Sequence, residues 1–333
     1  MGRNRLILDT DGGVDDAQAL LLLIAAGRPP DAITTVFGNV GLEDATRNVL
    51  ATLAVAGSLT PVHAGAGSPL ACERIDARHV HGEDGLGGAP RPAPLAEAAS
   101  CDGVDFLVST LARAAADHAP VDLLMIGPLT NLALALQREP AIVQGVGQMT
   151  IMGGTLYGRG NVTPAAEFNI FADPEAADAV LGSGIPITMI PWEPCMSHAL
   201  AGADIDRLFA PVPDGAYRTF AQALVDHERG RHISSGRGDC LYFIDALAAC
   251  VAIEPKIVTR STRAALAVSL APGVTRGMTI VDPSGRLGPC RVTLVEEVRR
   301  DRLAALLAAS LAYVPSRRPS PDALALARNE LGG

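Results

Sequence analysis

A cluster of carboxylates at the first strand-to-helix junction is the feature that most constrains this chain. An apolar run, Leu6–Leu8, and a segment with helical periodicity, Ala17–Ala26, enclose four acidic residues. They are Asp9, Asp11, Asp15 and Asp16. Carboxylates this close repel each other, so either a cation lies among them or some of them keep a proton. A hard cation with oxygen ligands is the ordinary solution. The sequence therefore predicts a metal site at the end of the first strand.

Asp15 and Asp16 are neighbours at the expected helix start, where successive side chains point about 100° apart. One carboxylate can then face a metal while the other faces a substrate. A simpler interpretation is that both residues cap the helix and complement its dipole. Capping accounts for one or two of the acids but not for four.

Composition narrows the class of protein. Hydrophobic residues make up 48% of the 333 residues, enough for a large core, and the net charge is −9. Lys256 is the only lysine and there is no basic run, so we expect no nucleic-acid partner. No segment approaches the ~20 apolar residues of a membrane span. The first strand begins by about residue 5, so we expect no signal peptide.

The six cysteines are scattered and form no Cys-x-x-Cys pair. This pattern favours reduced thiols over a disulfide framework or a zinc site. We therefore expect a cytoplasmic protein.

Apolar runs alternate with helical periodicity along most of the chain. Expected strands are Leu6–Asp9, Ile33–Phe37, Val121–Ile126, Gln148–Met152 and Pro186–Ile190. Expected helices are Leu42–Ala56, Gly103–His118, Asn131–Gln137, Pro174–Leu181, Tyr217–Glu228 and Phe243–Ile253. Such alternation predicts an α/β fold with a mostly parallel central sheet and helices on both faces. Ligands bind such sheets at the carboxyl ends of the strands, where the acidic cluster stands.

We expect one domain over residues 1–333, because no linker-like break divides the chain. Ala64–Ser100 is the longest irregular stretch, and such loops are usually functional or mobile. Short strand-like runs follow at Ala265–Leu270, Met278–Val281 and Arg291–Val295, then a helix from Arg300. Residues 315–333 are expected to form a tail with a short helix.

Several segments together resemble the inosine–uridine-preferring nucleoside hydrolase family. Asp9–Ala17 matches the family signature Asp-Thr-Asp-Pro-Gly-x-Asp-Asp-Ala at every fixed position except Gly12, where the family usually has proline. The other matching segments, in chain order, are Asn39, His81–Gly85, Gly127–Ala133, Met152–Gly154, Asn161–Asn169 with Asp173–Ala177, and Phe243–Ala248. The resemblance spans residues 5 to about 255.

The resemblance implies a Rossmann-like nucleoside hydrolase fold, Ca²⁺ as cofactor, a ribonucleoside as substrate, and a homodimer or homotetramer. The implied calcium ligands are Asp11, Asp16, Asp245 and the carbonyl of Thr130. The implied ribose and base contacts are Asp15, Asn39, His81, Met152, Asn161, Glu167, Asn169 and Glu193. The family mechanism further implies that calcium lowers the pKa of a bound water and that Asp11 is the general base.

The departing base also has to be stabilised, and here the chain departs from the family. Ile244 stands where many members carry a histidine thought to protonate the base. The nearby proton donors are His227, His232, Cys240, Tyr242 and His81. The alternative is stacking on an aromatic side chain, for which Trp192 is the candidate.

Two other functions fit parts of the sequence. Asp9-Thr10-Asp11-Gly12 resembles the start of haloacid dehalogenase-type phosphatases, but those enzymes need a lysine that Lys256 does not supply in a suitable place. Alternatively, the chain is a nucleoside- or sugar-binding protein on a hydrolase scaffold that has lost the leaving-group acid at position 244. The complete set of acidic residues argues against that, since simple binding needs no metal-activated water.

Overall fold

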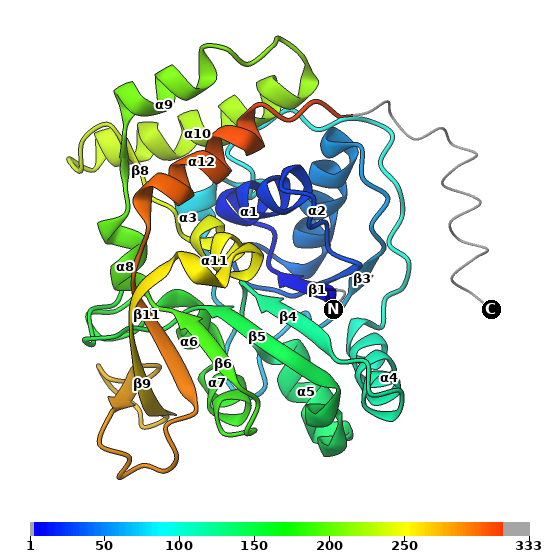
Figure 1. The fold of residues 1–333 in the computed structure, drawn as a ribbon, viewed down its shortest axis with the longest axis vertical. Helices are drawn as coiled ribbons and strands as arrows, with labels where there is room; N and C mark the ends of the chain where they lie inside the picture. The colour runs from blue at the N-terminus through cyan, green and yellow to red at the C-terminus, as the bar shows by residue number, and fades with distance from the viewer. Residues whose placement is uncertain (1–2, 316–333) are drawn as a thin grey trace.

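A mixed sheet of nine strands runs through the middle of the computed structural model, which describes residues 3–315 (Figure 1). The strands are β1 (Arg5–Thr10), β2 (Ala32–Thr35), β3 (Val62–Ala64), β4 (Val121–Met125), β5 (Val146–Met152), β6 (Ile187–Ile190), β9 (Val258–Val268), β10 (Thr279–Asp282) and β11 (Val292–Val298). Their order is β10-β9-β11-β6-β5-β4-β1-β2-β3. The strands from β11 to β3 are parallel, and β9 and β10 extend the sheet in antiparallel fashion. The predicted mostly parallel sheet is confirmed.

Helices cover both faces of the sheet. They are α1 (Val14–Ala25), α2 (Leu42–Ala56), α3 (Arg78–His81), α4 (Gly103–Ala116), α5 (Thr130–Arg138), α6 (Phe168–Ala172), α7 (Pro174–Leu181), α8 (Trp192–Ser197), α9 (Gly202–Phe209), α10 (Ala216–Ser234), α11 (Asp245–Ile253) and α12 (Arg300–Leu311). Two 3₁₀ helices, Pro140–Gly145 and Pro255–Ile257, and a two-stranded ribbon of β7 (Leu200–Ala201) and β8 (Cys240–Leu241) complete the described elements.

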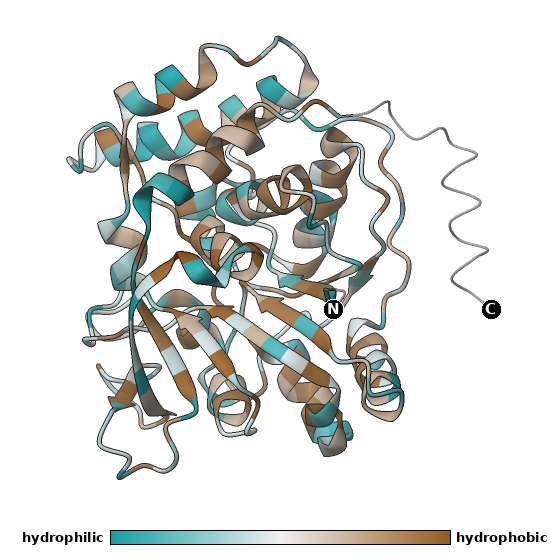
Figure 2. Ribbon diagram, viewed as in Figure 1, coloured by the Kyte–Doolittle hydropathy of each residue, from teal (hydrophilic) through white to brown (hydrophobic). Residues whose placement is uncertain are grey.

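Strand β1 shows how one segment serves two cores. Leu6 and Leu8 pack with α1, α10, α11 and α12 on one face, while Ile7 packs with α4, α5 and α7 on the other. Successive side chains of a strand point to opposite faces, so a strand buried on both sides has to be apolar throughout. Figure 2 shows brown, hydrophobic segments on the central strands, with white and teal segments between them.

Most expected elements are present, with shifts of a few residues at their ends. Helix α10 runs to Ser234 instead of ending at Glu228, six residues further, and so places His232 on the helix. Strand β9 begins at Val258, seven residues before the expected Ala265. The sequence did not predict this first half because it is largely exposed and carries no apolar run. The expected tail was residues 315–333, and all of it after Pro315 lies outside the described part of the chain. Among residues 3–315, no helix has the length and apolar character that crossing a membrane requires.

A buried amide joins the segments that meet at the carboxyl end of β1. Asn131, in the first turn of α5, donates to Asp9 Oδ2 at 2.7 Å and to the carbonyl of Thr35 at 3.0 Å. Its own oxygen accepts the backbone N–H of Ala66 at 2.7 Å. The backbone at Gly65 comes so close that a Cβ there would lie 2.2 Å from Asn131 Oδ1. One side chain therefore fixes β1, β2, α5 and the loop after β3 relative to each other.

Replacing Asn131 with leucine should destabilise the protein by about 2–4 kcal/mol, because the buried Asp9 carboxyl loses one of its two donors and the Ala66 N–H loses its acceptor. Urea unfolding followed by circular dichroism measures this free energy. Gln137→Ala, at an exposed position of the same helix, should change it by less than about 0.5 kcal/mol. Equal stabilities of the Asn131 and Gln137 variants would contradict the proposed role of the amide.

Candidate active site

Three buried carboxylates from two helix starts form the centre of the site. Asp15 and Asp16 lie in the first turn of α1, and Asp245 is the first residue of α11. One oxygen from each lies within 4.8 Å of the others, which is the arrangement of ligands around a metal ion. Asp15 was expected to contact the sugar and was not among the expected metal ligands. The structure places it in the same cluster as Asp16.

Asp16 is held by backbone and side-chain donors around the turn after β1. Its Oδ2 accepts the N–H of Gly13 at 2.7 Å, and its Oδ1 accepts the N–H of Asp11 at 3.2 Å and the hydroxyl of Thr10. The carboxylate therefore caps α1 and also faces the cluster, and the capping interpretation of this acid holds.

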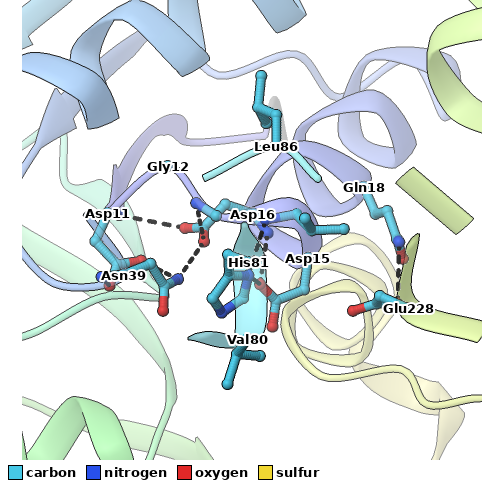
Figure 3. Close-up of polar contacts among 12 residues, drawn as sticks. Asp11, Gly12, Asp15, Asp16, Gln18, Asn39, Val80, His81, Leu86 and Glu228 are labelled. Carbon is cyan, nitrogen blue, oxygen red and sulfur yellow. Dashed lines mark hydrogen bonds and ion pairs between the residues drawn. The ribbon is translucent and has the colours of Figure 1, made fainter. Parts of the chain in front are cut away.

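Asp11 lies beside this cluster and is oriented by Asn39. The backbone N–H of Asn39 donates to Asp11 Oδ2 at 2.7 Å, and its side-chain amide donates to Asp11 Oδ1 at 2.9 Å. The same amide nitrogen lies 3.0 Å from Asp16 Oδ2, so Asn39 bridges two acids (Figure 3). A Cβ on Gly38 would lie 1.9 Å from Asp11 Oδ2, which is why this position needs glycine.

Burial and mutual repulsion make these acids hold their protons strongly. Burial, followed by the charges of neighbouring aspartates, raises the pKa of Asp11 and of Asp245 well above the usual range. Burial raises the pKa of Asp15 to about 6. Among residues 3–315, no arginine or lysine forms an ion pair with these carboxylates. A bound cation would supply the missing positive charge, and an all-oxygen donor set suits a hard divalent ion.

The turn after β1 explains the departure at Gly12. Its φ of +69° is in the left-handed region, which proline cannot adopt. A Cβ there would also lie 2.6 Å from the Cα of Ala45. The turn is fixed from outside by Asn48, whose amide donates to the Gly12 carbonyl at 2.8 Å. The chain therefore reaches Asp15 and Asp16 by a glycine turn that packs directly on α2.

His81 approaches the cluster from the long loop after β3. Its Nδ1 accepts the N–H of Val14 at 3.1 Å and lies 3.7 Å from Asp15 Oδ1. Burial lowers the pKa of His81 to about 4, so the ring is neutral at physiological pH. Because Nδ1 accepts a hydrogen bond, the ring hydrogen is on Nε2.

Glu167 and Asn169 form the side of the site next to β5. Glu167 accepts the N–H groups of Gly154 at 2.9 Å and of Asn169 at 3.0 Å, and burial raises its pKa to about 7. The Asn169 amide donates to the carbonyls of Ile126 and Met152 at 3.1 and 3.2 Å. These bonds fix the plane of the Asn169 amide at the carboxyl ends of β4 and β5. An amide held in this orientation is suited to binding a hydroxyl group of a substrate.

Other expected site residues form hydrogen bonds within the protein. Glu193 accepts the N–H groups of Leu156 and Tyr157, each at 2.7 Å. The exposed Asn161 accepts the N–H of Phe168 at 2.9 Å, and the Thr130 hydroxyl donates to Asp173 Oδ2 at 2.7 Å. These contacts hold the loops that surround the site.

Two candidate proton donors to the leaving base, His227 and His232, already form hydrogen bonds with backbone carbonyls. His227 Nε2 lies 2.8 Å from the Val80 carbonyl, and His232 Nδ1 lies 2.9 Å from the Cys240 carbonyl. A carbonyl only accepts, so each ring donates its hydrogen there. Trp192 is half-buried against the core on the α1 side of the sheet.

The sequence analysis did not identify one buried acid near the cluster, Glu228. Glu228 is 5% exposed, on the face of α10 that also buries Leu224 and Val225. Gln18 Nε2 donates to its Oε2 at 3.2 Å, and burial raises its pKa to about 8. The available signal was a glutamate four residues after Leu224, at a core position of an amphipathic helix.

The fold and the site define a class of α/β protein with buried oxygen ligands at the carboxyl edge of a parallel sheet. The model of the inosine-uridine preferring nucleoside hydrolase family matches residues 6–305. The pyrimidine-specific ribonucleoside hydrolase RihA of Enterobacter sp. (strain 638) is 36% identical over 94% of this chain and 99% of that protein. The non-specific ribonucleoside hydrolase RihC of Salmonella typhi is 35% identical over 93% of this chain and 98% of that protein.

A solved plant nucleoside hydrolase, the PpNRh1 enzyme, superposes with a TM-score of 0.84 at 31% identity and covers 94% of this chain and 100% of its own. The chain belongs to the inosine–uridine-preferring nucleoside hydrolase family.

The stability of the metal-free protein should fall as pH rises from about 4.5 to 8. In that range the folded state keeps protons on Glu167 and Glu228, with pKa values of about 7 and 8, that the unfolded chain has lost near 4.5. Urea unfolding with chelator at pH 5, 6.5 and 8 measures the slope. Glu228→Gln should flatten it above pH 7, and a stability that rises over this range would contradict the assigned shifts.

Proposed function

We propose that this chain hydrolyses the N-glycosidic bond of ribonucleosides to ribose and free base, with Ca²⁺ in the acidic cluster. The observation that carries this proposal is the buried group of Asp15, Asp16 and Asp245 beside Asp11, in a chain of the nucleoside hydrolase family. Family membership supports the reaction class, and the all-oxygen donor set supports the choice of a hard cation.

Asp11, Asp16, Asp245 and the Thr130 carbonyl would hold the ion, with Asp15 in the same cluster. When bound, calcium supplies the positive charge that offsets these carboxylates, orients the sugar hydroxyls and lowers the pKa of a water molecule. The raised pKa values of the metal-free cluster support this, since they arise from burial and from repulsion between like charges.

Asp11 takes a proton from the attacking water as the general base. Asn39 holds both of its carboxylate oxygens in place, so the base is oriented before substrate arrives. Asp15, Asn39, His81, Met152, Asn161, Glu167, Asn169 and Glu193 bind the nucleoside or hold the loops that do. Carboxylates and an amide oxygen around the ribose stabilise the positive charge that its ring acquires as the bond breaks.

The base preference is open within this proposal. The matched proteins are named pyrimidine-specific, non-specific and, for a solved structure at 28% identity, inosine-guanosine. A cytoplasmic location and an assembly of two or four copies also stay proposals. The six unpaired cysteines support the location, and the family resemblance supports the assembly.

Asp245→Asn should abolish tight calcium binding and lower activity by about 10³-fold or more, because the ion contributes several kcal/mol to the transition state. Calorimetric titration with Ca²⁺ and assays with and without chelator measure both effects. Asp117→Asn, at an exposed position, is the control. Full activity in the presence of chelator would contradict the metal assignment, and binding of nucleosides without turnover would identify a binding protein.

2′-Deoxynucleosides should be poorer substrates than ribonucleosides by roughly 10³-fold or more, because buried polar groups then lose their hydroxyl partner. The comparison is kcat/KM for inosine, uridine and their 2′-deoxy forms. Asn169→Ala should reduce this discrimination. Similar values for both sugars would show that the hydroxyl-binding residues are assigned wrongly.

A further inference from the structure

We propose that Asn48 and Arg91 are positioning residues that hold Asp16 in the orientation it needs for the cation, although neither belongs to the acidic cluster. Both roles rest on the proposed function, which places calcium among the acids. Three features of the structure support them: the hydrogen bonds of the Asn48 amide, the peptide group through which this amide reaches Asp16, and the loop to which Arg91 ties it.

Asn48 is a buried residue of α2 whose side-chain amide uses both of its hydrogens and its oxygen. Its Nδ2 donates to the carbonyl of Gly12 at 2.8 Å and to the carbonyl of Asp84 at 2.9 Å. Its Oδ1 accepts Nη2 of Arg91 at 2.7 Å. A carbonyl only accepts and a guanidinium only donates, so these three partners permit a single orientation of the amide. The Gly12 carbonyl therefore receives its hydrogen bond from a side chain that cannot turn over.

The Gly12 carbonyl and the Gly13 N–H belong to the same peptide group. That N–H donates to Asp16 Oδ2 at 2.7 Å, so one planar unit is held by Asn48 at one end and holds Asp16 at the other. Figure 3 shows Gly12 beside the Asp16 carboxylate. The unit lies between two glycines, which restrain backbone rotation little. Without the Asn48 bond, the peptide can rotate, and rotation breaks the bond to Asp16.

The Gly13 contact is the shortest of the measured N–H contacts to Asp16. It is 2.7 Å long, against 3.0 Å for the Asn39 amide and 3.2 Å for the Asp11 N–H. A carboxylate binds a cation well only when its lone pairs are held toward the ion. Loss of an outer partner that orients a metal ligand typically costs 10–100-fold in metal affinity or activity. The peptide that Asn48 fixes is such a partner.

Arg91 ties Asn48 to the loop that carries His81. Its Nη2 donates to Asn48 Oδ1 and to the Asp84 carbonyl, each at 2.7 Å, and lies 3.5 Å from Asp84 Oδ2. The loop backbone passes so close that a Cβ on Gly85 would lie 2.7 Å from Asn48 Nδ2. The loop therefore packs directly on the Asn48 amide, and Arg91 fixes the amide from the side opposite its two hydrogens.

The same loop reaches the turn before α1 a second time. His81 Nδ1 accepts the N–H of Val14 at 3.1 Å, and Val14 follows Gly13 directly. Two parts of one loop thus act on consecutive peptide groups, one through Asn48 and one through His81. The orientation of Asp16 therefore depends on a segment that is distant in sequence and contributes no ligand of its own.

A purely stabilising role for Asn48 makes a different prediction. Such a contact would lower the free energy of unfolding and leave the calcium affinity of the folded protein unchanged. Thr52 is the matched control, because it is buried one turn further along α2 and its hydroxyl donates to the Asn48 backbone carbonyl at 2.9 Å. Thr52→Val should cost stability without changing calcium affinity.

The decisive experiment is calorimetric titration of the full-length chain with Ca²⁺, with circular dichroism to show that each variant is folded. Asn48→Leu introduces no charge and removes the bond to Gly12, so it should weaken calcium binding by about 10–100-fold. Arg91→Met should weaken it by a smaller factor. Loss of a positive charge alone would favour a nearby cation, so weaker binding in this variant separates positioning from simple electrostatics.

The calcium dependence of activity gives a second measurement. With the better of inosine and uridine, Asn48→Leu should need about 10–100-fold more calcium for half-maximal activity and should approach the unmodified kcat at saturating calcium. General damage to the site would instead lower kcat at every calcium concentration. Arg91→Lys should retain more calcium affinity than Arg91→Met, since lysine still offers a donor to Asn48.

Each contrary result has a definite meaning. Unchanged calcium affinity in Asn48→Leu, or an equal loss in Thr52→Val, would overturn the role of Asn48 while the proposed hydrolysis stands. Unchanged or tighter binding in Arg91→Met would overturn the role of Arg91. The Arg91 side chain is 26% exposed, so its variants decide the question if Asn48→Leu fails to fold. Failure of the unmodified chain to bind calcium would overturn the metal assignment of the proposed function, and both roles with it.

Discussion

Repulsion among buried carboxylates is the interaction on which the rest of this structure depends. Asp11, Asp15, Asp16 and Asp245 are all less than a tenth exposed, and among residues 3–315 no arginine or lysine forms an ion pair with them. The groups that bond to them include the N–H groups of Gly13 and Asn39 and the hydroxyl of Thr10. The fold therefore brings together carboxyl groups that either keep protons or need a cation beside them.

The periodicity of the sequence was sufficient to predict the sheet and most of its helices. Apolar runs such as residues 121–126 are long enough to identify a buried strand, and parallel pairing follows from the helices between them. The ends of elements were less predictable. Helix α10 continues past Glu228 because Arg229, through Asp206 and Asp239, fixes this part of the helix to α9 and to the loop before β8. Those partners are distant in sequence and carry no local signal.

The site was predicted as a set of residues but not as a geometry. Motif matches brought Asp11, Asp15, Asp16 and Asp245 together, and the structure places these acids in one region. Which of them share a cluster depends on how α1 and α11 meet, which is a tertiary property. Glu193 illustrates the limit: its residue type suits a sugar, yet its carboxylate accepts two backbone N–H groups. The pairing of Glu228 with Gln18 spans 210 residues, beyond the reach of any motif.

The position of α10 has a consequence for how such proteins diversify. The acidic cluster and Asn169 belong to the sheet and to helices that start at its edge, whereas Glu228, His227 and His232 all belong to α10, which packs on α1, α2, α3 and β8. In the proposed function, substitutions along that helix would alter candidate donors to the departing base and leave the residues for the cation and the sugar in place. The base and the sugar would then be contacted by separate elements, in a family whose members are named for different nucleosides.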